Sequence, residues 1–237
     1  VRISMPDKTV KFTVQLPDET MTFPRKPFTL KGETTAILPF NMPLNSALLK
    51  YATAQPLSKI KAAENDLLFL MELNDVPVEL AFNAKTINKI DAKDWKKTEE
   101  NGIIYLNKVN EVSSPIHVND KNGNSTTIQL VSRQQAENSW RINIQGKESM
   151  VITNADLMID NNAIELRQLA NPNFEMDIYP VPKSGDLLFG NKKLKGTKNG
   201  IFKQYTITLN TIDLGIDSKM LSSDKAAVQI PRKLPQN

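Results

Sequence analysis

Short segments in which apolar and polar residues alternate run through most of this chain, and they limit the folds that it can adopt. In residues 9–16 every second residue is apolar, so an extended chain would place these side chains on one face. Similar strand-like segments lie at residues 67–71, 78–82, 126–131, 140–144, 163–167, 174–179 and 204–209. Turn-forming residues separate many of them, at 73–75, 120–124, 160–162 and 171–173. The pattern predicts an all-β, β-sandwich-like fold, which we expect to consist of two packed antiparallel β units.

One polar segment stands out as a candidate boundary between these units. Residues 91–100 (DAKDWKKTEE) are mostly charged and lack an apolar stripe that a helix could bury. We therefore expect a charged connector at 91–100, a first β unit over residues 1–90 and a second over residues 101–210. Residues 211–237 would form a C-terminal tail, with one further strand at 226–230.

Composition excludes several classes of function. The chain has 30 basic and 26 acidic residues without a long block of one sign, which argues against a nucleic-acid partner. No apolar run approaches the roughly 18–20 residues of a membrane-spanning helix, so we expect no membrane partner. The absence of cysteine excludes disulfides, thiol nucleophiles and thiolate metal sites. With a single histidine besides, we expect no metal site and no cofactor.

Candidate catalytic groups are few. His117 follows Pro115 and precedes a turn, which favours a surface loop residue over a general base. Glycosidases use two carboxylates about 5–10 Å apart, and Asn110-Glu111 is similar to the dipeptide at the acid/base position of many barrel glycosidases. No alternating strand–helix pattern surrounds it here, so chance explains the match better. We expect no catalytic residue in this chain.

Aromatic side chains are the candidates for carbohydrate binding, because their flat faces stack on sugar rings. We consider Trp95, Trp140 and Tyr51 in this role. The structural alternative is that Trp140 caps a sandwich core and that Trp95 packs the connector down. We favour the structural role for both tryptophans.

Residues 38–57 (LPFNMPLNSALLKYATAQPL) combine apolar runs with three prolines and predict a strand–turn–strand corner. Together with residues 76–83 (VPVELAFN), this line resembles the region that follows the catalytic barrel in bacterial glycoside hydrolase family 35 β-galactosidases. Residues 139–167 and 174–182 also look like the distal part of that region, in the same order. The resemblance thus covers most of residues 9–182.

The resemblance implies a non-catalytic accessory or structural module of a β-galactosidase-type glycoside hydrolase. No segment here matches the barrel motifs that carry the family's two catalytic glutamates, so the chain alone would not be an enzyme. Its main partner would be the catalytic barrel of its own parent chain, with carbohydrate as a second candidate partner. A start on valine rather than methionine fits a piece of a longer protein. By analogy with the family, we expect a periplasmic or extracellular location.

Two other functions remain open at this point. The chain would be a carbohydrate-binding module for galactose-containing glycans if Trp95, Trp140 or Tyr51 lay on an open face. It would be an enzyme in its own right if carboxylates such as Glu111 did chemistry.

Overall fold

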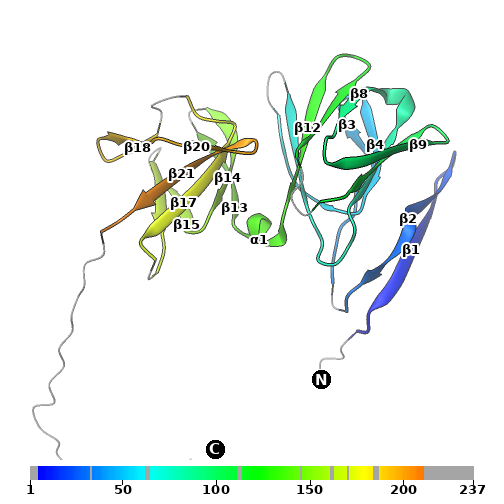
Figure 1. Ribbon diagram of the computed structural model, residues 1–237, viewed down its shortest axis with the longest axis horizontal. Helices are drawn as coiled ribbons and strands as arrows, with labels where there is room; N and C mark the ends of the chain where they lie inside the picture. Colours follow the sequence, from blue (N-terminus) through cyan, green and yellow to red (C-terminus); the bar gives the residue numbers. More distant parts are fainter. Residues whose placement is uncertain are drawn as a thin grey trace, which may run out of the picture.

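The computed structural model of this chain describes residues 5–32, 34–61, 65–110, 114–144, 146–160, 163–169, 171–183 and 187–210. Strands make up most of this length, which confirms the predicted all-β, sandwich-like fold. Figure 1 shows two lobes side by side, a larger one built from the N-terminal half and a smaller one built from the C-terminal half, with the short helix α1 between them.

The chain begins with an antiparallel hairpin, here called the N-terminal hairpin. It consists of β1 (Lys8–Gln15) and β2 (Thr20–Leu30). Alternate side chains of the hairpin, among them Phe12 and Phe23, pack on the outer face of the larger lobe. The apolar residues that alternate along residues 9–16 are thus the ones that face the larger lobe.

The larger lobe is a sandwich of two five-stranded sheets, here called the central sandwich. The first sheet has the order β3 (Phe40–Leu44), β4 (Ala47–Ala52), β7 (Glu79–Asn83), β10 (Ile103–Lys108), β9 (Trp95–Glu100). The second has the order β5 (Gln55–Ile60), β6 (Asp66–Met71), β12 (Ser125–Val131), β11 (Ile116–Asp120), β8 (Ile87–Asp91). Neighbouring strands are antiparallel except β6 and β12, which are parallel. A short 3₁₀ turn, Ala84–Thr86, joins β7 to β8.

Side chains from both sheets meet between them and form the main core, which includes Leu49, Leu70, Phe82 and Leu106. Strand β6 is buried along most of its length, which explains its nearly continuous apolar sequence DLLFLM. One of its faces points into the core, and the other faces the smaller lobe.

The smaller lobe, here called the C-terminal unit, follows helix α1 (Arg133–Glu137), which begins with a capping box of Ser132 and Gln135. Its main sheet has the order β13 (Ser139–Ile144), β14 (Lys147–Thr153), β17 (Asn173–Tyr179), β21 (Phe202–Thr208), β20 (Thr197–Asn199). Two small hairpins accompany this sheet: β15 (Asp156–Asp160) with β16 (Ala163–Arg167), and β18 (Leu188–Phe189) with β19 (Lys192–Lys193).

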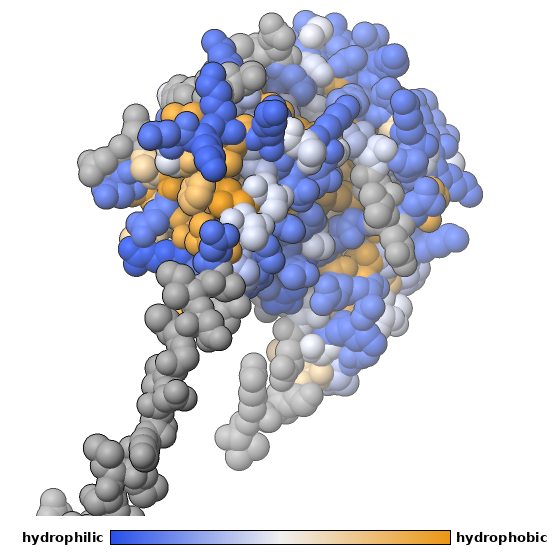
Figure 2. Space-filling model, turned by 60° about the vertical axis from the view of Figure 1, so that its left-hand side comes forward, coloured by the Kyte–Doolittle hydropathy of each residue, from blue (hydrophilic) through white to orange (hydrophobic). Residues whose placement is uncertain are grey.

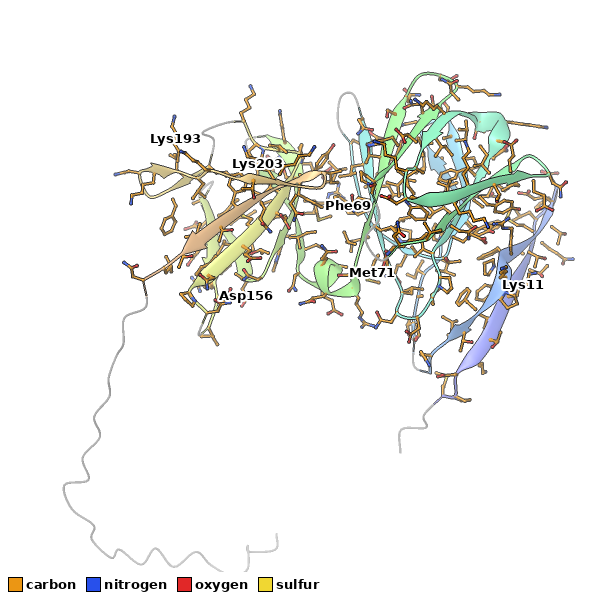
Figure 3. The ribbon with its side chains drawn as sticks, in the orientation of Figure 1. Lys11, Phe69, Met71, Asp156, Lys193 and Lys203 are labelled. Atoms are coloured by element: carbon orange, nitrogen blue, oxygen red, sulfur yellow. The ribbon has the colours of Figure 1, made fainter. Side chains whose placement is uncertain are left out.

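An apolar cluster joins the two lobes. Phe69 of β6 stacks on Phe202 of β21, with their ring centroids 5.8 Å apart. Met150 and Ile152 of β14 lie in the same buried cluster. Phe69 lies where the lobes meet in Figure 3. The C-terminal unit is therefore docked on the outer face of the second sheet.

The corner predicted at residues 38–57 is confirmed. β3 and β4 form a hairpin whose turn uses Asn45 at a φ of 53°, in the left-handed region that asparagine tolerates. After β4 the chain bends at Thr53 and Ala54 and enters β5 in the opposite sheet. The segment thus carries the chain from one sheet of the sandwich to the other.

The predicted connector at 91–100 is wrong. Residues 95–100 form strand β9, which pairs with β10 along its whole length. The first sheet contains β7, from before this segment, and β10, from after it, so the central sandwich continues past residue 100 to Val131. Residues 211–237, including the strand expected at 226–230, lie outside the described residues.

Candidate functional site

The three aromatic candidates lie in different surroundings. Trp95 is 6% exposed and belongs to the core of the central sandwich, and its Nε1–H faces the carbonyl of Ser114 at 3.4 Å. Tyr51 is 2% exposed beneath the N-terminal hairpin. Neither ring has a free face, so the carbohydrate-binding role considered for Trp95 and Tyr51 is wrong. Trp140 is 38% exposed in β13 and keeps an accessible surface.

Of the acid–base candidates, the structure describes only His117. His117 lies exposed in strand β11 rather than in a loop, with its Nδ1 2.9 Å from the hydroxyl of Thr127. Glu111 lies outside the described residues. Within the ranges that the structure describes, no group of three or more histidine and acidic side chains is arranged to hold a metal ion.

The most concentrated polar chemistry surrounds Glu79, which is 5% exposed on the outer face of the first sheet. Its Oε1 accepts hydrogen bonds from the Tyr51 hydroxyl at 2.6 Å and from the backbone N–H of Arg25 at 3.0 Å. Its Oε2 accepts from the Nε–H of Arg25 at 3.1 Å and from the amide of Asn107 at 2.9 Å. A carboxylate offers about four acceptor positions, so those of Glu79 are filled.

Arg25, from β2, is the cation of this group. Its two terminal nitrogens donate to the hydroxyl of Thr98 at 3.1 Å and to Oδ1 of Asn107 at 2.7 Å. Its guanidinium also lies over the Tyr105 ring, 4.0 Å from the centroid, in a cation–π contact. We call these six residues the Glu79 cluster: Glu79, Arg25, Tyr51, Thr98, Tyr105 and Asn107.

Electrostatics keep Glu79 ionised in spite of its burial. Burial raises the pKa of Glu79, but hydrogen bonds from Tyr51, Asn107 and both groups of Arg25 outweigh it, and the pKa of this carboxyl lies below its usual value. Burial and the neighbouring carboxylate raise the pKa of the Tyr51 hydroxyl far above its usual range. The pair therefore consists of a neutral phenol and a charged carboxylate, and Glu79 has no free lone pair with which to act as a base.

A pocket opens beside the Glu79 cluster, where β2 meets β9 and β10. It has a volume of about 710 Å³. Its polar lining comes from Arg25, Lys26, Glu79, Lys96, Thr98 and Asn107, and its apolar lining from Pro24, Pro27, Phe28 and Pro77. We call it the polar pocket.

A second, mostly apolar pocket of about 400 Å³ lies in the C-terminal unit, between its main sheet and the two small hairpins. Ile144, Met176 and Ile207 line it from the sheet, and the exposed side chains of Leu188 and Phe189 line it from β18. Figure 2, in which this lobe comes forward, shows apolar side chains gathered on its surface between hydrophilic ones.

The pairing of Glu79 with Arg25 was not predicted from the sequence. One signal was present: Glu79 is the single charged residue in the predicted strand at residues 78–82 (VELAF), whose other residues are apolar. A carboxylate in such a strand needs a partner when it is buried. The partner comes from 54 residues earlier, and no local pattern identifies it.

Comparisons with known proteins give no family. No protein-family model matches the chain, and no curated protein matches it. In the described part of the chain, no helix has the length and apolar character needed to cross a membrane.

Proposed function

We propose that this chain is a non-catalytic β module of a family 35-type β-galactosidase, acting in glycan degradation by supporting the catalytic barrel or the oligomer of its parent enzyme. One observation carries the proposal: the side chains of the segment at residues 38–57, which resembles the family, make contacts that hold the fold together. The Tyr51 hydroxyl binds Glu79, and Gln55 accepts a hydrogen bond from the backbone of Ile37. Thr53 is fully buried and bonded to two backbone groups.

These contacts explain why such a line would belong to a β module rather than to an active site. Ala52 and Ala54 have no exposed surface and lie in the main core, where larger side chains would not fit. Every polar side chain from Tyr51 to Gln55 forms a hydrogen bond with another part of the chain. The resemblance therefore concerns a scaffold, and the hydrolytic chemistry belongs to another part of the parent protein.

The test compares this chain with the protein encoded by its complete open reading frame. We expect the purified 237-residue chain to release no chromophore from a nitrophenyl β-galactoside during a long incubation. We expect the complete protein to contain a barrel with two catalytic glutamates, to hydrolyse the same substrate and to be located outside the cytoplasm. Hydrolysis by the short chain that Glu111→Gln abolishes would instead establish an enzyme in its own right.

A carbohydrate-binding module is the second candidate, and the exposure of Trp140 favours it. An exposed indole face is a common platform for a sugar ring. Calorimetric titration with galacto-oligosaccharides measures this directly, with Trp140→Ala as the test variant and Phe189→Ala as an exposed aromatic control. Binding that only Trp140→Ala removes would support this candidate, and no heat from any galactoside would remove it.

A further inference from the structure

The side chains that line the polar pocket offer more free hydrogen-bond donors than free acceptors. The carboxylate of Glu79 has both oxygens occupied by donors from within the fold. The carbonyl oxygen of Asn107 accepts from Arg25, and the hydroxyl oxygen of Thr98 does so as well. The acceptors that line the pocket are therefore largely used by the protein itself.

Donors remain in excess at the same place. Arg25 has five N–H groups, of which three donate within the Glu79 cluster and two are left over. The hydroxyl proton of Thr98 and the second amide proton of Asn107 also have no acceptor among the described residues. Lys26 and Lys96 line the pocket, and their side chains make no ion pair or hydrogen bond with any residue that the structure describes.

Charge points in the same direction. Three cationic side chains, Arg25, Lys26 and Lys96, line the pocket, against one carboxylate whose charge Arg25 already offsets. The two lysines come from different strands, β2 and β9, so a bound anion would lie between them. A volume of about 710 Å³ exceeds the space needed by a free inorganic ion and is within the range of small-molecule sites.

We propose that the polar pocket binds a small organic anion through its carboxylate, sulfate or phosphate group, with Lys26 and Lys96 as the cationic contacts and Arg25, Thr98 and Asn107 as further donors. The proline and phenylalanine side chains of the pocket contact the body of the ligand. The inference does not depend on the proposed module function, because it concerns binding by this chain alone.

Calorimetric or NMR titration of the full chain tests it, at low salt, with galacturonate, galactose 6-sulfate, inorganic sulfate and neutral galactose as probes. We expect an oxyanion-bearing probe to bind more tightly than galactose, because only the former supplies acceptors and charge. The double variant Lys26→Ala/Lys96→Ala should weaken that binding about tenfold, since each lysine contact is a partly solvated charge-assisted bond.

The matched control is Lys89→Ala/Lys97→Ala, which removes the same charge from exposed positions on β8 and β9 outside the pocket. We expect this control to bind like the parent chain. Tighter binding of galacturonate or of the sulfate ester than of inorganic sulfate assigns the ligand to an acidic sugar, and equal binding of inorganic sulfate contradicts the organic ligand proposed here. The proposal is overturned if no anion binds, if galactose binds equally well, or if both double variants weaken binding to the same extent.

Discussion

At the scale of single residues, Glu79 shows how the fold accommodates a buried charge. The carboxylate has exchanged water for four donors, and its cation is itself bonded to Thr98 and Asn107. Such a pair is costly to break from one side, because the remaining charge is left without compensation. The N-terminal hairpin is thus attached to the first sheet by a polar contact as well as by its apolar face.

Replacing Glu79 should destabilise the chain strongly. In Glu79→Gln the side-chain shape is retained, but Arg25 loses its counter-charge and some donors meet an amide N–H₂. We expect a loss of about 3 kcal/mol in the free energy of unfolding, the lower end of the range for a broken buried pair, because Arg25 is partly exposed. Urea denaturation measures it. Glu99→Gln, an exposed change on β9, is the control and should alter stability by less than about 0.5 kcal/mol.

The same carboxyl predicts a dependence of stability on pH. Its folded pKa lies below its ordinary value of 4.5, so the ionised form stabilises the fold fully above about pH 4.5, and this contribution is lost as the pH falls through the lowered pKa. Asp120 acts in the same direction. Burial raises its pKa, but hydrogen bonds from Asn124, Ser46 and Asn122 outweigh this, and the pKa lies below its usual value.

We therefore expect the unfolding temperature to fall below about pH 4.5 in the parent chain, and to fall less steeply in Glu79→Gln. Thermal unfolding followed by circular dichroism between about pH 3 and pH 7 compares the two. Identical slopes in both proteins would show that Glu79 does not contribute to acid sensitivity.

At the scale of elements, the corner between β4 and β5 is held by one side chain. The Thr53 hydroxyl donates to the carbonyl of Pro77 at 2.6 Å and accepts from the backbone N–H of Glu79 at 2.8 Å. The backbone N–H of Thr53 donates to the carbonyl of Glu79 at 3.0 Å. The bend that moves the chain between the two sheets is thereby fixed to the start of β7.

Thr53→Val tests this attachment, because valine has nearly the same shape but no hydroxyl. Two buried backbone groups would lose a partner, and we expect the free energy of unfolding to fall by about 3 kcal/mol. Denaturant titration measures the change. Thr13→Val, at an exposed position of the N-terminal hairpin, should have almost no effect, and an equally small effect at Thr53 would contradict the proposed role.

Element by element, the strands that alternate clearly could be predicted from the sequence. The strand β9 could not, because it is the edge of its sheet and carries the charges that edge strands use to avoid pairing with other chains. With Trp95 as its one buried residue, it has too little apolar pattern to be distinguished from a connector. The Glu79 cluster was hidden for a different reason: it joins β2, β4, β7, β9 and β10, and such contacts depend on tertiary structure.

At the scale of the whole molecule, the contact between the lobes depends on a few apolar side chains. Phe69 is fully buried, Phe202 is 7% exposed, and they stack on each other. Around them, side chains from β5, β6, β14 and α1 complete the cluster.

Phe69→Ala and Phe202→Ala should each destabilise the chain by about 3 kcal/mol, because each removes a large side chain from a packed contact. In the double variant the losses should be less than additive, since both remove the same stacking contact. Denaturant unfolding of all four proteins completes the cycle, with Phe189→Ala as an exposed control. Strict additivity would show that the two rings do not depend on each other.

The corner segment also contacts every part of the molecule. Tyr51 stacks on Phe23 of the N-terminal hairpin, 4.9 Å between centroids, Ala52 and Ala54 lie in the core of the central sandwich, and Leu57 packs in the cluster shared with the C-terminal unit. Seven consecutive residues thus couple three structural parts. A chain coupled in this way should melt cooperatively, because loosening the corner removes support from all three parts at once.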